Sequence, residues 1–326
     1  MGNFAFSFLI SILLFAAALA GLLVFGNVSP PAPLAEVTGP FASIDRSSLP
    51  PLLRYTARDG AELSYLCYPG DEQRAVILIH GSAGSAADMH LMALALQSAG
   101  HLVVVPDLRG HGGNRPHGDI AHPGQLDEDM EDMIKLLRAE HPRAHWSLVG
   151  FSSGGGFALR TAAGPLGGGF ERVLLLSPFL RYDAPTVRRA APAGDNPQSK
   201  APAWTTVAIG RIIALAILNG FRIHALDGLP VLYFAVPQEM EAVTPRYSWR
   251  LLQNFQPRDN FRADIRAVKA PMEVLVGSKD ELFYPEKFVQ VFGAERGDVP
   301  VVILPGLGHS AMATDPAAIQ AVAGAL

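Results

Sequence analysis

Short apolar runs alternate with longer stretches of helical periodicity through most of this chain, and this alternation limits the possible folds most. Each run is nearly continuous Val, Ile and Leu, and the runs lie at residues 75–79, 102–105, 146–149, 172–176, 272–276 and 299–304. Strands that are apolar on both sides are typical of parallel sheets covered by helices on both faces. Residues 54–68 predict two further strands around the Asp59-Gly60 turn, antiparallel at one edge. The fold class is therefore α/β with a mostly parallel central sheet.

Length, charge and cysteine content exclude several classes of protein. The chain has 326 residues, enough for one large α/β domain with an insertion or for two smaller domains. The formal net charge is −4, with no long run of one sign, which argues against nucleic acid as a partner. Cys67 is the single cysteine, so no disulfide within the chain is possible. No cluster of His, Cys and carboxylate residues suggests a metal site, and no cofactor is predicted.

The N-terminal segment is long and apolar. Residues 4–25 contain no charged residue, and at about 1.5 Å per residue they extend for roughly 30 Å, the thickness of a bilayer core. Ala18-Leu19-Ala20 has the form of a signal-peptidase site, which makes a cleaved signal peptide the alternative. No Lys or Arg precedes the run, and apolar residues continue past Ala20. We therefore expect residues 1–28 to be a single-pass anchor with an extracytoplasmic catalytic domain; after cleavage the domain would be secreted or periplasmic.

The predicted domain organisation follows from where the alternation begins and breaks. Residues 29–51 begin with Ser29-Pro30-Pro31-Ala32-Pro33 and predict a stiff linker. Residues 52–178 and 261–326 form the two parts of the core, because residues 179–260 interrupt the alternation.

The interruption predicts a cap, or lid, inserted after a sheet strand. It contains an apolar run at residues 204–218, whose larger apolar side chains share one helical face: Ile209, Ile212, Ile213, Ala216 and Ile217. This helix either packs on the core, or its apolar face shapes an acyl pocket or contacts lipid. Arg211 interrupts the run, which is also short for a second membrane span.

A Gly-x-Ser-x-Gly motif, Gly150-Phe151-Ser152-Ser153-Gly154, follows a buried strand and begins a stretch that can form a helix. A sharp strand–turn–helix places the middle Ser in a strained conformation and crowds the residues two before and two after it. Gly150 and Gly154 meet that requirement for Ser152. With Ser153 in the middle, Phe151 would occupy a crowded position. Ser152 is therefore the predicted nucleophile.

A serine hydroxyl needs a base to take its proton, and the base needs an acid to orient it. Asp280 follows the strand at residues 273–276, and His309 follows the strand at residues 301–304. The carboxyl ends of parallel strands lie at one sheet edge, so both residues are expected near Ser152. Glu281 is the alternative acid. The other early-loop histidines, His80 and His111, precede glycines and predict structural hydrogen bonds.

The negative charge that forms on an attacked carbonyl oxygen needs two N–H donors. One is expected from Ser153, the residue after the nucleophile. The other is expected from the loop His80-Gly81-Ser82-Ala83-Gly84, with Ser82 as the donor and Ala83 as the next choice.

These motifs together resemble the α/β-hydrolase superfamily, especially its lysophospholipase and monoacylglycerol-lipase-like branch, which is grouped with serine aminopeptidase-type domains. The matching segments are His80-Gly81, residues 107–112, the turn at Ser152, residues 277–280 and Gly308-His309. They lie within residues 52–326, with the predicted cap as the divergent part. The resemblance implies hydrolysis of carboxylic esters, often of lipids, by Ser152, Asp280 and His309.

Three functions are consistent with the sequence. The first is a serine hydrolase that cleaves small or lipid-like carboxylic esters through an acyl-enzyme. The second is a serine aminopeptidase-type enzyme, for which Glu239 and Glu241 could hold the substrate ammonium group. The third is a binding protein without catalytic activity, although a binder gives no reason to keep Ser152, Asp280 and His309 together.

Overall fold

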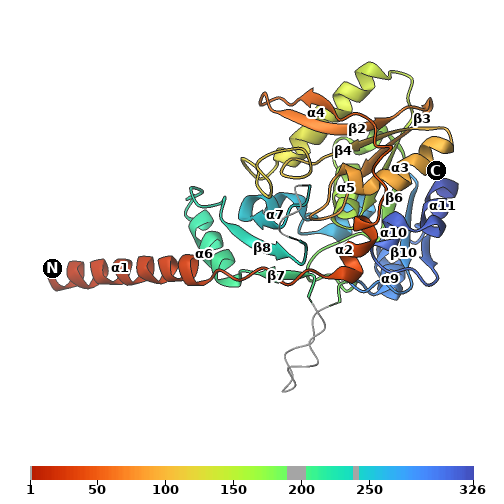
Figure 1. The fold of residues 1–326 in the computed structure, drawn as a ribbon. Helices are drawn as coiled ribbons and strands as arrows, with labels where there is room; N and C mark the ends of the chain where they lie inside the picture. Colours follow the sequence, from red (N-terminus) through yellow and green to blue (C-terminus); the bar gives the residue numbers. More distant parts are fainter. Residues whose placement is uncertain (1, 189–202, 238–241) are drawn as a thin grey trace.

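The computed structural model describes residues 2–188, 203–237 and 242–326 (Figure 1). An eight-stranded sheet, with strand order β1-β2-β4-β3-β5-β6-β10-β11, forms its centre. The strands are β1 (Leu53–Thr56), β2 (Glu62–Tyr68), β3 (Asp71–Ile79), β4 (His101–Pro106), β5 (Trp146–Phe151), β6 (Phe170–Leu176), β10 (Met272–Gly277) and β11 (Val301–Leu304). Strand β2 runs antiparallel to β1 and β4, whereas the six strands from β4 to β11 are parallel. The predicted mostly parallel sheet with an antiparallel edge is confirmed.

Helices cover both faces of this sheet, because its strands are apolar on both sides. Along β3, Ala75, Ile77 and Ile79 belong to one buried cluster, and Val76 and Leu78 belong to the other. The first cluster includes side chains of α4 (Gln125–Glu140), α5 (Ser153–Ala163), α8 (Phe261–Ala267) and α9 (Pro285–Glu295). The second includes side chains of η1 (Ala86–Met89), α3 (His90–Ser98), α10 (Ala311–Thr314) and α11 (Pro316–Ala325).

The region between β6 and β10 forms a second, smaller sheet. Its antiparallel strands are β7 (Thr205–Val207), β8 (Pro230–Phe234) and β9 (Arg246–Ser248), and its helices are α6 (Ile209–Gly220) and α7 (Trp249–Phe255). These elements lie within residues 179–260, the part of the chain for which the sequence predicted a cap. Residues 189–202 and 238–241, with the candidate residues Glu239 and Glu241, lie outside the described part of the chain.

The apolar run at residues 204–218 differs from the single helix that its periodicity predicted. Its first residues form β7, which pairs with β8, and the helix begins only at Ile209. In α6 the buried side chains are Ala214 and Leu215, whereas Ile209 is 64% exposed and Ile213 is 46% exposed. The side of α6 that packs on protein is therefore centred on Ala214 and Leu215 and overlaps the predicted apolar face only in part, at Ile212.

Helix α1 (Gly2–Phe25) projects away from the rest of the molecule, and its last turn meets α6 (Figure 1). The Nε of Arg211 donates to the carbonyl of Leu23 at 2.9 Å. Gly26 and Gly210 lie so close that a Cβ on either would come within 2.9 Å of the other's backbone. Residues Phe6–Phe25 form one helix that is long and apolar enough to cross a membrane.

The predicted linker at residues 29–51 contains a short helix, α2 (Ala35–Ala42), that packs on the core. Leu34 and Val37 are buried. The N–H of Leu34 donates to the carbonyl of Ala235 at 2.9 Å, and the hydroxyl of Ser310 donates to the carbonyl of Val37 at 2.7 Å. This part of the segment therefore differs from the expected stiff linker, because Leu34 and Val37 are buried against the core.

Candidate active site

Ser152 lies at the sharp turn between β5 and α5. Its φ of 54° is in the left-handed region, which is strained for a residue with a side chain. A Cβ at Gly150 would lie 2.3 Å from the carbonyl oxygen of Gly154, and a Cβ at Gly154 would lie 2.2 Å from that of His80. The backbone of this turn therefore requires glycine at both positions.

His309 lies between Ser152 and Asp280 in a buried chain of hydrogen bonds. Its Nε2 is 2.9 Å from Oγ of Ser152, and its Nδ1 is 2.9 Å from Oδ2 of Asp280. The parallel strands β5, β10 and β11 bring the three residues together, because the loop at each carboxyl end opens on the same sheet edge. The structure thus joins the three residues that the sequence singled out.

The environment of Asp280 favours the ionised carboxylate. Its Oδ1 accepts the main-chain N–H groups of Leu282 and Phe283, each at 2.9 Å. Burial raises the pKa of this carboxyl, but the positive charge and hydrogen bond of His309 and the N–H of Phe283 outweigh burial and hold the pKa below its ordinary value. An ionised Asp280 can fix the His309 ring and stabilise a positive charge on it.

Glu281, the alternative acid, has a different contact. Its Oε2 accepts the main-chain N–H of His309 at 2.9 Å, whereas the ring of His309 is bound by Asp280. The carboxylate of Glu281 therefore holds the loop, and the geometry favours Asp280 as the acid.

The loop after β3 lies against the turn at Ser152, because the hydroxyls of Ser82 and Ser153 are hydrogen-bonded to each other. The N–H of Ala83 donates to the hydroxyl of Tyr247 at 2.9 Å. The N–H groups of Ser82 and Ser153 donate to no acceptor in the described part of the chain. The sequence offered two N–H donors in the loop after β3, those of Ser82 and Ala83. Because Tyr247 binds the N–H of Ala83, the N–H of Ser82 is the one available to a ligand.

The two early-loop histidines make structural hydrogen bonds, as predicted. The N–H of Leu108 donates to Nε2 of His80 at 3.2 Å, and Nε2 of His111 lies 2.6 Å from the hydroxyl of Tyr247. Burial lowers the pKa of both rings, more strongly for His111, so both stay neutral at pH 7. Tyr247 belongs to the second sheet, and no sequence motif pointed to it.

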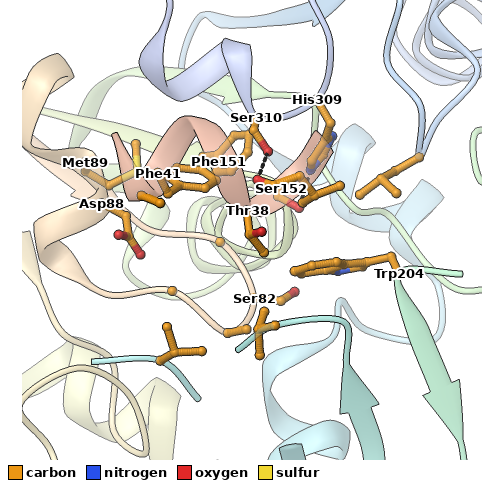
Figure 2. A pocket seen from close by; sticks show the side chains of 18 of the residues that line it. Thr38, Phe41, Ser82, Asp88, Met89, Phe151, Ser152, Trp204, His309 and Ser310 are labelled. Atoms are coloured by element: carbon orange, nitrogen blue, oxygen red, sulfur yellow. Dashed lines mark hydrogen bonds between the residues drawn. The ribbon is translucent and has the colours of Figure 1, made fainter. Parts of the chain in front are cut away.

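Ser152 and His309 open into a mostly apolar pocket (Figure 2). Its apolar side chains come from α2, η1, β5 and the loops beside β7, β8 and β10, and include Val37, Phe41, Met89, Phe151, Trp204 and Leu282. The contribution of α2 was not predicted, because the sequence of this segment is typical of a stiff linker. Among the described lining residues the only carboxylate is that of Asp88, which is bound by Arg46 at 2.8 Å. No group of three or more His, Cys, Asp or Glu residues is placed to hold a metal ion in the described residues.

The fold and the site together define an α/β hydrolase, and the comparison with protein families agrees. Residues 76–322 match the alpha/beta hydrolase family, so the chain belongs to that family, as predicted.

Individual relatives agree with the predicted branch. The chain is 27% identical over 243 residues to a monoacylglycerol lipase from Mycolicibacterium smegmatis, a match that covers 73% of this chain and 82% of the relative. A soluble variant of monoglyceride lipase from Saccharomyces cerevisiae has a similar fold, with a TM-score of 0.61, 17% identity, and coverage of 86% of this chain and 94% of that chain. A bacterial membrane phospholipase A has a TM-score of 0.57, 19% identity, and coverage of 98% of this chain and 97% of that chain.

Proposed function

We propose that this protein is a serine hydrolase that cleaves lipid-like carboxylic esters through an acyl-enzyme. The observation that carries the proposal is the hydrogen-bonded chain of Ser152, His309 and Asp280 at the wall of an apolar pocket. A base within 2.9 Å of a serine hydroxyl, itself oriented by a carboxylate, is the arrangement that activates serine in nucleophilic catalysis.

The proposed reaction proceeds in two halves. Nε2 of His309 takes the proton of Ser152 as Oγ attacks the ester carbonyl, and the N–H groups of Ser82 and Ser153 bind the oxyanion. The tetrahedral intermediate collapses as His309 gives the proton to the leaving alcohol. A water molecule then attacks the acyl-enzyme, His309 takes its proton, and the acid is released as Ser152 regains its hydrogen. Asp280 keeps the His309 ring oriented throughout.

The lining of the pocket favours an apolar acyl group over a charged one. The side chains of Val37, Phe41 and Trp204 offer dispersion contacts and little hydrogen bonding. The names of the relatives, monoacylglycerol lipase and monoglyceride lipase, support an acyl ester of a small alcohol as the substrate class.

Hydrolysis of nitrophenyl esters beside aminoacyl anilides separates the proposed esterase from an aminopeptidase. The proposal expects turnover of acyl esters by the wild type and none by Ser152→Ala. Cleavage of anilides in preference to every ester would support the peptidase. An ammonium substrate would need a free carboxylate, and Asp88 in the described lining is already bound to Arg46. The absence of Ser152-dependent turnover of both substrate types would favour the binding protein.

We also propose that α1 is an uncleaved anchor and that the catalytic domain lies outside the cytoplasm. Exposed apolar side chains on and just after α6, the helix that meets the last turn of α1, support contact with the same bilayer, since Ile209, Ile213 and Phe221 are 64%, 46% and 67% exposed. If α1 is an uncleaved anchor, the protein should resist carbonate extraction and keep its N-terminus, which mass spectrometry can show. If the catalytic domain lies outside the cytoplasm, protease added to spheroplasts should cleave it. A mature protein that begins after Ala20 would support the signal peptide instead.

A further inference from the structure

Helix α2 supplies part of the wall of the pocket into which Ser152 opens. Val37, Thr38, Phe41 and Ala42 all line it, yet they precede the residues that match the hydrolase family, 76–322. The connection from the N-terminal helix is therefore part of the site. We propose that α2 determines the acyl-chain length that the enzyme accepts. This inference rests on the proposed ester hydrolysis.

The side chains of α2 lie close to the reacting groups. The ring centroid of Phe41 is 6.1 Å from that of Phe151, the residue before Ser152. The ring centroid of Phe151 is 5.0 Å from that of His309. Figure 2 shows Phe41 beside Phe151, and Thr38 lines the same pocket as Ser152 and Trp204. An acyl group on Ser152 would therefore enter a pocket whose wall α2 helps to form.

Hydrogen bonds along its length hold α2 in place. Before its first turn, the N–H of Leu34 donates to Ala235, the residue after β8. In its middle, the carbonyl of Val37 accepts the buried hydroxyl of Ser310, the residue after His309. These contacts tie α2 to the second sheet and to the loop that carries the base.

A charged side chain fixes the other end of α2. The Nη2 of Arg46 donates to the carbonyl of Phe41 at 3.0 Å and to Oδ1 of Asp88 at 2.8 Å. Asp88 in turn accepts the N–H of Ser85, so Arg46 joins α2 to the first turn of η1. Because α2 is held at its start, middle and end, its side chains form a fixed boundary, and a fixed boundary can discriminate between chain lengths.

The size of the side chains on α2 therefore controls the room for the acyl group. Phe41→Ala removes a ring from the pocket wall and makes room for a longer acyl chain. Each methylene of the substrate that gains an apolar contact there is expected to raise kcat/KM about fourfold. Thr38→Phe adds a ring to the pocket wall and reduces the space for the acyl group. The two substitutions are expected to act in opposite directions, which a general loss of stability would not do.

The test is a profile of kcat/KM for nitrophenyl esters from acetyl to palmitoyl, using the full-length protein in detergent. Active-site titration with a fluorophosphonate corrects each rate for the folded fraction. Tyr182→Ala is the matched control, because Tyr182 is 64% exposed and lies outside the pocket lining. Phe41→Ala is expected to raise the ratio of long-chain to short-chain rates by at least about tenfold, and Thr38→Phe to lower it. The control should keep the wild-type profile.

Two negative results have different meanings. If Phe41→Ala and Thr38→Phe change the rates on all esters by one common factor, the inference about α2 is overturned while ester hydrolysis stands. If the wild type shows no Ser152-dependent hydrolysis of any ester, the proposed function is overturned and the inference falls with it.

Discussion

The hydroxyl of Tyr247 accepts the N–H of Ala83 at 2.9 Å and lies 2.6 Å from Nε2 of His111. Tyr247 belongs to β9, so the small second sheet reaches into the loop that follows the central strand β3. Because this contact occupies the N–H of Ala83, the N–H of Ser82 is the one left to face a ligand. The second sheet therefore takes part in shaping the proposed oxyanion site.

Tyr247→Phe removes this hydroxyl and leaves two buried polar groups without a partner. Each such group costs about 1–3 kcal/mol, so we expect the free energy of unfolding to fall by about 2–6 kcal/mol. The loop that carries Ser82 should also be held less firmly, and kcat should fall about tenfold, with KM nearly unchanged. Denaturant melts and ester kinetics measure both effects. Tyr182→Phe, at an exposed position, should change neither, and a Tyr247→Phe variant with wild-type kcat would contradict this role.

Asp280→Asn and Glu281→Gln form a matched pair, because the two carboxylates bind different parts of His309. Loss of the carboxylate that orients a catalytic histidine lowers kcat by about 10⁴ in serine proteases, and we expect a similar loss for Asp280→Asn. Glu281→Gln keeps an oxygen acceptor for the main-chain N–H, so its rate should stay within about tenfold of the wild type. A larger loss for Glu281→Gln than for Asp280→Asn would assign the acid to Glu281.

The sequence predicted the parallel sheet and its reactive loops because both depend on local patterns. Ser152, Asp280 and His309 each follow an apolar strand, and parallel strands place such loops at one edge. The same reasoning did not reach Tyr247 or Phe41, whose contacts are with residues far away in the chain. Nothing in the local sequence distinguishes a helix that packs on the core from a stiff linker.

The apolar run at residues 204–218 shows a second limit of local patterns. Helical periodicity correctly indicated a helix, but Thr205–Val207 forms a strand because β8 offers it a partner. The apolar face predicted for the helix is exposed at Ile209 and Ile213. Periodicity therefore identified an apolar face but did not indicate whether that face packs against protein.

Gly154→Ala and Gly293→Ala compare a glycine that the turn at Ser152 requires with an exposed glycine in α9. A Cβ at Gly154 would lie 2.2 Å from the carbonyl oxygen of His80, whereas a Cβ at Gly293 in α9 meets nothing within 4 Å. Gly154→Ala is expected to destabilise the protein by about 3 kcal/mol or more. Gly293→Ala should stabilise it by about 0.5–1 kcal/mol, as is usual for an exposed helical position. Thermal melts measure both, and equal effects would contradict the turn geometry.

The buried histidines His80 and His111 predict that stability falls as the pH is lowered. Burial holds the pKa of both below the ordinary value of 6.5, so below that pH the unfolded chain binds protons that the folded chain does not. Each histidine therefore contributes stability that is present in full above pH 6.5 and is lost below it, with a slope of up to about 1.4 kcal/mol per pH unit. Urea melts between pH 7.5 and 5 should show a shallower slope for His111→Asn than for the wild type. An unchanged slope for His111→Asn would rule out this source.

Covalent labelling of Ser152 tests the central claim most directly. The full-length protein is treated with a fluorophosphonate, digested, and the modified peptide is identified by mass spectrometry. We predict one adduct on Ser152, its absence in Ser152→Ala, much slower labelling in His309→Ala, and no adduct on Ser153. An unlabelled wild-type protein, or equal labelling of Ser152→Ala, would contradict the assignment of Ser152 as the nucleophile.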